Sequence, residues 1–513
     1  MHYTLVILQH QCNIAYISKS LLNIKIYCYN ILAMKKKVAI LANGSNYEIL
    51  YRFEEALYES SKSLEVDYFN FLWNKTPDNC HNGYNGAIFK LPNLKKFDAV
   101  VIFNPGLNLA ENIDYVYTKA DVAHIPVISI GMEYPGFSYI GIDNYSGMKD
   151  LCTHLIEEHG VRNIHMIAGS RDNEDSNTRV RAVWDVLNEH GIGIDPNHVY
   201  YSDWLTSAAA NYVERLIDSG EELPDAFICA NDYLAEMVGY VLSTHNINVP
   251  NDCIVTGFDH NEEGRIYSPS IASIDQQYDI IGQKTALLLK NLFNGEPASD
   301  STIVSCKFIP GESCGCLNPR DNDTIRKEYT NALLRKRRIV DIIDSETAIL
   351  RKAMIESESF EDLSRKLNDL FSTGFSPEGK TFYMMLDEGL KNFADTVNTD
   401  FPEYTFSENM KVVFGKYNGE VIGASFTNTS ELIPEYHSTG PNHSYYFIPI
   451  CFDSFACGYV VFCDKNEWVL ERSFLAFEDV FTEALDLYRR KVRLNALESR
   501  LHGIIDKIEN DSF

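Results

Sequence analysis

Basic residues are scarce in this chain of 513 residues, in which 45 Lys and Arg stand against 72 Asp and Glu and the formal net charge is −27. Nucleic-acid binding draws most of its affinity from Lys and Arg that neutralise phosphates, so direct DNA binding is disfavoured. The chain also lacks an uninterrupted apolar run of the roughly 18 to 20 residues that a membrane helix requires. We therefore expect no membrane partner and at most indirect contact with DNA.

The twelve cysteines lack the dense, regular spacing of a disulfide scaffold, which a chain of this length does not need. A reducing compartment fits best, so we expect a cytoplasmic protein. Cys306, Cys314 and Cys316 come closest to a cluster, but they lack the paired C-x-x-C spacing that is usual for tetrahedral zinc sites. The sequence predicts free thiols and no metal, and it places His154 and His159 on a helix surface.

Motifs of covalent catalysis are missing as well. The chain has no G-x-S-x-G elbow, no H-E-x-x-H, no Walker loop and no glycine-rich dinucleotide fingerprint after a strand. The sequence therefore predicts a protein that is not an enzyme and has no cofactor.

The length leaves room for about three domains, and the composition is that of an ordinary globular protein. Met34 followed by Lys35, Lys36 and Lys37 is typical of a natural chain start. We interpret residues 1–33 as a non-native or disordered extension, because they fit neither a secretory signal nor a membrane span.

From residue 35 onward, short apolar runs alternate with longer amphipathic stretches such as residues 47–63. The runs lie at 38–41, 66–69, 99–103, 127–130, 164–167, 226–229 and 253–256. This succession predicts an α/β fold with parallel strands buried on both faces. Asn144 and Asp232 are expected to cap the helices at 145–159 and 233–244.

The composition changes after Cys316. A charged helical linker is expected at 323–371, and a mixed α+β domain at 372–475, with strand-like runs and an Asn418-Gly419 turn. In residues 476–513 apolar side chains recur in steps of three and four, as in a coiled coil that pairs two chains. Packing on its own domain explains the first half of this helix equally well. The seam consists of Phe477, Val480, Ala484, Leu487, Leu494, Leu497, Leu501, Ile504 and Ile508.

Polar residues follow several of the apolar runs. Asn104, Asn231 with Asp232, and Asp259 each stand where a predicted strand ends. Ligands of open α/β sheets bind outside the carboxyl ends of the strands, so these side chains are expected near one crevice. We expect Asp232 to act as a helix cap, and Asn231 and Asp259 to contact a ligand.

Five segments, in this order, make residues 35–310 resemble the sensor domain of the LacI/GalR family: 140–145, 176–179, 229–232, 256–259 and 276–282. The resemblance implies a two-lobed, periplasmic-binding-protein-like (type I) domain at 35–316. Its two α/β lobes would be joined by three crossovers, with a sugar or related metabolite between them.

The resemblance also implies roles for individual residues. Arg179 would clamp adjacent hydroxyls with its planar guanidinium. Asn231, Asp259 and Gln276 would hydrogen-bond the ligand from the second lobe, and Asn46 and Tyr47 would lie over it. Trp204 is expected to stack on an apolar sugar face, with partial burial at a lobe edge as the alternative.

The chain departs from this family at both ends. Residues 1–33 contain no helix-turn-helix pattern, and the part beyond Cys316 resembles sensors that add a coiled coil and a GAF-like domain. We therefore expect a homodimeric, ligand-responsive signalling module. Two alternatives stay open, namely a LacI-family transcription regulator that acts on DNA directly or through a partner, and the sensory half of a diguanylate cyclase or kinase.

Overall fold

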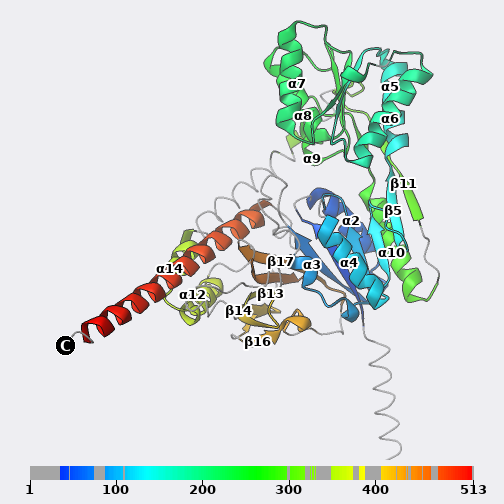
Figure 1. The fold of residues 1–513 in the computed structure, drawn as a ribbon. Helices are drawn as coiled ribbons and strands as arrows, with labels where there is room; N and C mark the ends of the chain where they lie inside the picture. The colour runs from blue at the N-terminus through cyan, green and yellow to red at the C-terminus, as the bar shows by residue number, and fades with distance from the viewer. Residues whose placement is uncertain are drawn as a thin grey trace, which may run out of the picture.

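Two parallel sheets, each covered by helices on both faces, are formed by the described residues between 35 and 317 (Figure 1). The computed structural model describes residues 35–44, 47–73, 87–107, 110–193, 195–296, 301–317, 348–373, 381–387, 406–422, 425–434, 441–452, 455–463 and 472–510, with a few single residues between them. Residues 1–33 and the basic run 335–338 lie outside the described residues.

The first lobe has a parallel sheet of strand order β11-β5-β4-β3-β1-β2. Its strands are β1 (Lys36–Asn43), β2 (Val66–Trp73), β3 (Ala99–Phe103), β4 (Val127–Ile130), β5 (Ser138–Asp143) and β11 (Ser301–Ser305). Its helices are α2 (Tyr47–Ser60), α3 (Ala87–Lys90), η2 (Leu94–Lys96), α4 (Ala110–Ala123) and α10 (Tyr278–Phe293). Alternate residues of β1 enter two different cores, Val38 and Ile40 in one and Ala39 and Leu41 in the other. The strand is therefore apolar throughout because it is buried on both faces.

The second lobe has a four-stranded parallel sheet of order β7-β6-β8-β9. Its strands are β6 (Ile164–Ala168), β7 (Val199–Tyr201), β8 (Ala226–Cys229) and β9 (Ile254–Thr256). Its helices are α5 (Asn144–His159), α6 (Glu174–Glu189), η3 (Pro196–His198), α7 (Thr206–Ser219), α8 (Asp232–Thr244) and α9 (Glu262–Ile266).

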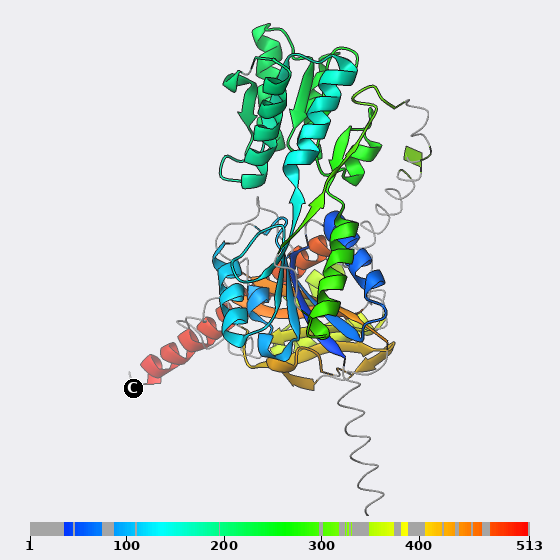
Figure 2. The ribbon, with the colours of Figure 1, turned by 90° about the vertical axis from the view of Figure 1, so that its right-hand side faces the viewer.

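Three crossovers join the two lobes, as Figure 2 shows. The chain passes from β5 into α5 at residues 143–144, and from β10 (Ser273–Asp275) into α10 at 276–277. It crosses again between β11, which pairs with β5, and β12 (Lys307–Ile309), which pairs with β10. The predicted two-lobed α/β fold is confirmed for this part of the chain.

Both predicted helix caps were wrong by one residue. The carboxylate of Asp143, not Asn144, caps α5 by accepting the Ser146 N–H at 2.9 Å. The amide oxygen of Asn231, not Asp232, caps α8 by accepting the Leu234 N–H at 2.9 Å. Each pair offers two polar side chains with capping ability, and the direction in which the chain leaves the preceding strand decides between them.

The sheet of the first lobe continues into the C-terminal part of the chain. Strands β13 (Phe382–Asp387), β14 (Asn409–Tyr417), β15 (Glu420–Ile422), β16 (Ser425–Asn428), β17 (Ser444–Phe452) and β18 (Phe455–Cys463) form an antiparallel sheet, with η6 at Thr429–Glu431. Strand β17 pairs in parallel with β2, from Ser444 opposite Tyr68 to Phe447 opposite Phe71, so the combined sheet has 12 strands. The sequence predicted the α+β character of this part but not its pairing with the first lobe.

A buried carboxylate organises the junction between β2 and β17. Asp67 accepts hydrogen bonds from Lys35 Nζ at 2.8 Å, from the His443 N–H at 2.8 Å and from Tyr436 OH at 3.0 Å. The Phe71 and Phe447 rings stack beside it with centroids 4.8 Å apart. Since the side chains of Lys35 and Asp67 are almost fully buried, each charge depends on the other for compensation.

Two helices accompany the antiparallel sheet, α12 (Phe360–Thr373) and the long α14 (Arg472–Asn510). Leu350 and Met354 of the predicted linker are fully buried in the core that also holds Val38. In α14, Ala484, Leu485 and Tyr488 are buried, whereas the following part projects away from the sheet (Figure 1) and exposes apolar side chains. These are Leu494, Leu497, Leu501, Ile504 and Ile505. The coiled coil remains a prediction, and nothing is described of the side chains of Phe477, Val480 and Ile508.

Among the described helices, none has the length and apolar character needed to cross a membrane.

The buried Lys35–Asp67 pair at the junction of β2 and β17 gives a stability prediction. Asp67→Ala leaves the buried Lys35 ammonium without its carboxylate, so we expect the free energy of unfolding to fall by about 3 to 5 kcal/mol in urea denaturation. Glu189→Ala removes a carboxylate that pairs with Lys149 at 2.7 Å on the surface, and should leave the free energy of unfolding nearly unchanged. Equal effects of the two substitutions would contradict the role that we assign to Asp67 in stabilising the junction of β2 and β17.

Candidate functional site

Arg179 lies in α6 and is 4% exposed. Its Nε and Nη2 donate to Asn144 Oδ1 at 2.9 and 2.8 Å, and its Nη1 donates to the Ala230 carbonyl at 2.6 Å. The guanidinium carbon lies 3.6 Å from the centroid of the Phe258 ring, a cation–π contact. A guanidinium has five N–H groups, and these contacts with described residues use three, so one N–H on each terminal nitrogen is available for a further acceptor.

Local sequence explains how Arg179 reaches this position. Asn173 caps α6 by accepting the Ser176 N–H at 2.8 Å, and Ser176 Oγ accepts the Gly169 N–H at 2.9 Å. These bonds fix the start of α6 against the end of β6. Asn144, the main partner of Arg179, is the first residue of α5 and lies directly after the first crossover. Arg179 is therefore attached to the connection between the lobes.

Asp259 and Gln276 form the second half of the site. Gln276 Nε2 donates to Asp259 Oδ1, and Tyr278 OH donates to Gln276 Oε1 at 2.8 Å. This chain of donors fixes the amide orientation of Gln276 and leaves the other carboxylate oxygen of Asp259 available as an acceptor. Asp259 has φ +107°, a region that residues with a side chain rarely adopt. Backbone strain of this kind occurs often at functional sites.

The electrostatics centre on one buried cation among carboxyls. Burial raises the pKa of Asp259 to about 6, although the positive charge of Arg179 and the hydrogen bond from Gln276 oppose this shift. Burial also raises the pKa of Asp175, which accepts a 2.9 Å bond from Asn144 Nδ2, and Arg179 again opposes the shift. A neutral ligand with hydroxyl groups suits this site because each hydroxyl can both accept from Arg179 and donate to Asp259.

Asp232 organises the loops beside the site. Its carboxylate accepts Ser273 Oγ–H at 2.6 Å and the Asn261 N–H at 2.7 Å, and burial raises its pKa well above the usual value. A Cβ on Gly257 would lie 2.1 Å from Asp232 Oδ1, so only glycine fits there without a shift of the carboxylate. The cap role expected for Asp232 is replaced by this buried network, and the cap role belongs to Asn231.

The first lobe contributes Asn104, which is partly buried at the end of β3. Its Nδ2 donates to the Ile130 carbonyl at 3.0 Å and to Ser129 Oγ at 3.1 Å. Its Oδ1 is buried and has no hydrogen-bond partner among the described residues. An unsatisfied buried acceptor is uncommon and calls for a donor such as a water molecule or a ligand hydroxyl.

For three further residues that were predicted to contact a ligand, the structure offers less support. Trp204 is partly buried with φ +65°, and its indole fills the space over Gly169, where a Cβ would come within 2.2 Å of it. This packing matches the alternative of partial burial at a lobe edge, and stacking on a ligand stays a prediction. Asn46 lies outside the described residues, and of Tyr47 only the backbone is described, as the first residue of α2.

Two charged residues of α2 make contacts between the lobes that the sequence does not predict. Glu48 in α2 accepts the Glu262 N–H at 2.8 Å and Arg265 Nη2 at 3.0 Å, both from the second lobe. Arg52, one turn further along α2, makes two bonds to Asp275 at 3.0 and 3.1 Å beside the second crossover. No local pattern distinguishes these residues from other charged positions on an amphipathic helix.

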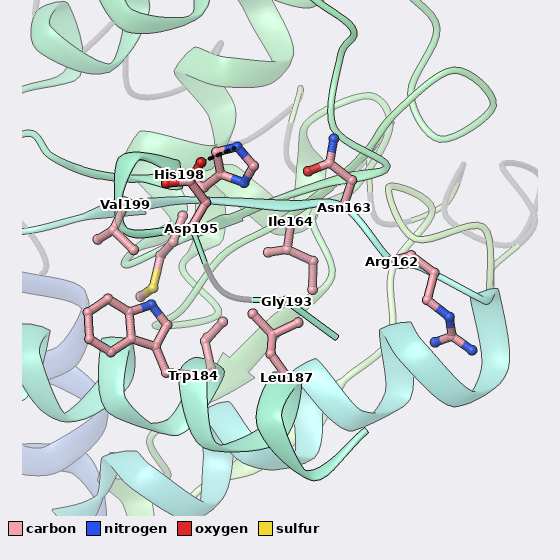
Figure 3. Close-up of a pocket in the computed structure, with 11 residues that line it drawn as sticks. Arg162, Asn163, Ile164, Trp184, Leu187, Gly193, Asp195, His198 and Val199 are labelled. Carbon is pink, nitrogen blue, oxygen red and sulfur yellow. Dashed lines mark ion pairs between the residues drawn. The ribbon is translucent and has the colours of Figure 1, made fainter. Parts of the chain in front are cut away.

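Figure 3 shows a separate small pocket at the opposite edge of the second lobe, near the start of β6. Its volume is about 90 Å³, and its lining includes Arg162, Asn163, Trp184, Asp195 and His198. Ligand pockets usually measure roughly 300 to 1,000 Å³, so this one suits a few waters better than a metabolite.

Residues 153–314 match the family model described as "Periplasmic binding protein-like domain". Among curated proteins, the chain is similar to the HTH-type transcriptional regulator CelR of Thermobifida fusca, with 27% identity over 188 residues, or 36% of this chain and 55% of that protein. It is also similar to the HTH-type transcriptional repressor CytR of Escherichia coli, with 26% identity over 171 residues, or 33% of this chain and 50% of that protein. The chain thus spans about half the length of the curated relatives that it matches.

The chain was also compared with solved structures. The transcriptional regulator CelR–cellobiose complex has 19% identity and a TM-score of 0.43, with 55% of this chain and 85% of that chain covered. The lac repressor dimer bound to operator and the anti-inducer ONPF has 16% identity and a TM-score of 0.44, with 54% of this chain and 94% of that chain covered. The family match shows that residues 153–314 are similar to a periplasmic-binding-protein-like α/β domain.

Proposed function

We propose that residues 35–316 bind a sugar or a related small metabolite between the two lobes, and that the chain is a ligand-responsive regulator without catalytic activity. The observation that carries this proposal is the gathering of Arg179, Asp259 and Gln276 beside the crossovers. The family match at 153–314 supports it, as do relatives named as transcriptional regulators, one of them in complex with cellobiose.

The ligand would be held from both lobes. Arg179 would donate to adjacent hydroxyls, and the second carboxylate oxygen of Asp259 would accept from one of them. On the first lobe, Asn104 Oδ1 would accept a hydrogen bond from a ligand hydroxyl. That bond would give this buried acceptor its partner. A ligand that meets both lobes favours a closed arrangement, because only differential affinity for two states can shift their populations.

We further propose that closure is transmitted to the C-terminal part along the chain that leaves the second lobe. Arg326, beyond the last crossover, donates to the Tyr267 carbonyl at 3.0 Å and pairs with the buried carboxylate of Glu312. The antiparallel sheet with α12 and α14 beside it has the α+β composition of a GAF-like domain, which supports that resemblance. The exposed seam of α14 would pair two chains as a parallel coiled coil.

Two alternatives differ in output. A regulator that binds DNA directly is favoured by the names of the relatives, whereas the charge of −27 speaks against DNA contact by this chain. A sensory half of a diguanylate cyclase or kinase would need a catalytic segment elsewhere. A sequence-specific, salt-resistant complex with DNA at nanomolar protein in a gel-shift assay would favour the direct regulator.

The ligand site can be tested by substitution. A panel of hexoses, pentoses, cellobiose and nucleosides is first screened by thermal shift, and the ligand found is titrated by calorimetry. Arg179→Ala and Asp259→Ala should each weaken binding by about 2 to 5 kcal/mol, because truncation leaves buried partners unpaired. Arg162→Ala, in the separate pocket of Figure 3, is the matched control and should bind normally. Unchanged affinity in both site variants would place the site elsewhere.

Binding should also depend on pH. The pKa of Asp259 is raised to about 6, so its carboxylate is present at pH 7 and is lost as the pH falls through 6. A ligand with a hydroxyl that donates to the Asp259 carboxylate should therefore bind about tenfold more weakly at pH 5 than at pH 7. His260, whose pKa burial lowers to about 4, stays neutral over this range.

Glu48 and Asp175, whose pKa values burial also raises, are competing sources of such a pH dependence. Asp259→Asn should bind weakly at both pH values with no such dependence, while Glu48→Gln should retain it. A pH dependence that survives Asp259→Asn would contradict the assignment.

Dimerisation through α14 gives a further test. Leu497→Asp combined with Leu501→Asp places like charges opposite each other across the seam, so sedimentation should shift toward monomer while ligand binding persists. Val122→Asp, an exposed apolar position in the first lobe, is the control and should leave the oligomeric state unchanged. A double variant as dimeric as the parent would mean that the seam is not the dimer contact.

A further inference from the structure

Four side chains with metal-binding atoms meet at the outer end of α5 in the second lobe. His154 and His159 come from the last turns of α5, and Cys314 and Cys316 come from the segment after β12. One ligand atom from each of the four lies within 4.8 Å of all the others. Nothing in the chain order brings these residues together, since 162 and 157 positions separate Cys316 from His154 and His159.

The distances among three of these atoms are short and nearly equal. His154 Nε2 and His159 Nε2 lie 3.2 Å apart, and each lies 3.2 Å from Cys316 Sγ. Zinc bonds of 2.0–2.1 Å to nitrogen and 2.3 Å to sulfur, arranged as a tetrahedron, separate two nitrogens by about 3.3 Å and a nitrogen from a sulfur by about 3.6 Å. The observed atoms are therefore spaced much as ligands of one metal ion are.

Hydrogen bonds alone account poorly for this arrangement. An imidazole N–H lies in the ring plane and points in one direction, so each Nε2 can donate along only one of its two contacts. A triangle of three mutual contacts then brings lone pairs together without protons between them. A cation at the centre would accept all of these lone pairs at once.

The surrounding structure holds the four groups in place. Cys314 is 1% exposed, and the His154 ring packs on Phe308 with centroids 4.7 Å apart. Gly315 has φ +86°, a conformation that residues with a Cβ rarely adopt, and it allows the two thiols on either side to turn toward α5. The C-terminal end of a helix carries partial negative charge, which favours a cation there.

We propose that His154, His159, Cys314 and Cys316 bind one Zn²⁺ ion. Two imidazoles and two thiolates are a common structural zinc set, and this donor combination favours zinc over hard cations such as Mg²⁺ or Ca²⁺. The two thiolates neutralise the ion. The metal ties the segment that leaves the second lobe to α5, a few residues before the chain continues toward Arg326, and this role does not depend on sugar binding between the lobes.

The sequence predicts free thiols because it shows a C-x-C pair with one neighbouring cysteine and no paired C-x-x-C spacing. That neighbour, Cys306, is not part of the cluster, and the missing ligands are the two histidines that were expected on a helix surface. In the competing arrangement Cys314 stays a thiol and donates to the Gly311 carbonyl, which lies 3.2 Å from its Sγ.

The full chain, purified under reducing conditions, is dialysed against metal-free buffer and analysed for bound metals by mass spectrometry. We expect about one zinc per chain in the parent, and a loss of at least about nine-tenths of it in Cys314→Ser with Cys316→Ser and in His154→Asn with His159→Asn. His190→Asn with His245→Asn and the single variant Cys306→Ser are matched controls that should retain the zinc. Cys316→Ser alone, at an exposed position, tests the site where the double variants fail to fold.

Cobalt substitution gives a second readout that needs no ligand of the sensor. Co²⁺ added to the metal-free chain should produce the intense visible bands of a tetrahedral thiolate site, and zinc should displace it and raise the unfolding temperature. Absence of stoichiometric zinc after titration, zinc retained by both double variants, or a Cys314–Cys316 disulfide in the native protein would each overturn the proposal.

Discussion

Strand β2 is hydrogen-bonded along both edges, to β1 on one side and to β17 on the other, and the arrangement of the chain depends on this double pairing. An edge strand left open would expose unpaired N–H and C=O groups and invite aggregation. Here the edge of the first lobe is covered by a strand more than 350 positions later in the chain. All eight residues of β2 are buried as a result, including the charged Asp67 and the polar Asn70.

The same pairing makes the first lobe and the antiparallel part share their cores. One core holds Val38 from β1 together with Leu363 from α12 and Tyr446 from β17, and Tyr446 donates to the buried Glu54 of α2 at 3.0 Å. The second lobe, in contrast, is joined by three crossovers and by side-chain contacts such as Glu48 with Arg265. Packed cores resist small deformations, so relative motion is expected at the crossovers rather than within the 12-stranded sheet.

The two sites that we propose lie in the second lobe, the part of the chain that is expected to move at the crossovers. Arg179, Asp259 and Gln276 lie at the end of the second lobe that faces the crossovers, where a ligand would sense their geometry. The four proposed zinc ligands lie at the C-terminal end of α5, whose first residue, Asn144, holds Arg179 at the other end. One helix thus connects the ligand site to the segment through which the chain leaves the lobe.

The sequence determined most of the elements and named several residues of the proposed ligand site. Runs of apolar residues predicted β1 to β4, β6, β8 and β9 because parallel strands are buried on both faces, but not β5, β7 or β11. Polar residues at strand ends pointed to Asn104 and Asp259 because a parallel sheet aligns those ends. The resemblance to a known sensor added Arg179 and Gln276. Only the tertiary structure decided which residue of each polar pair caps its helix, since neighbouring side chains have equal capping ability and the local chain direction selects one.

The tertiary structure also decided which strand pairs with the second edge of β2. It likewise brought His154 and His159 into contact with Cys314 and Cys316. Those contacts join residues far apart in the chain, and their side chains follow no local periodicity that a sequence pattern can reveal.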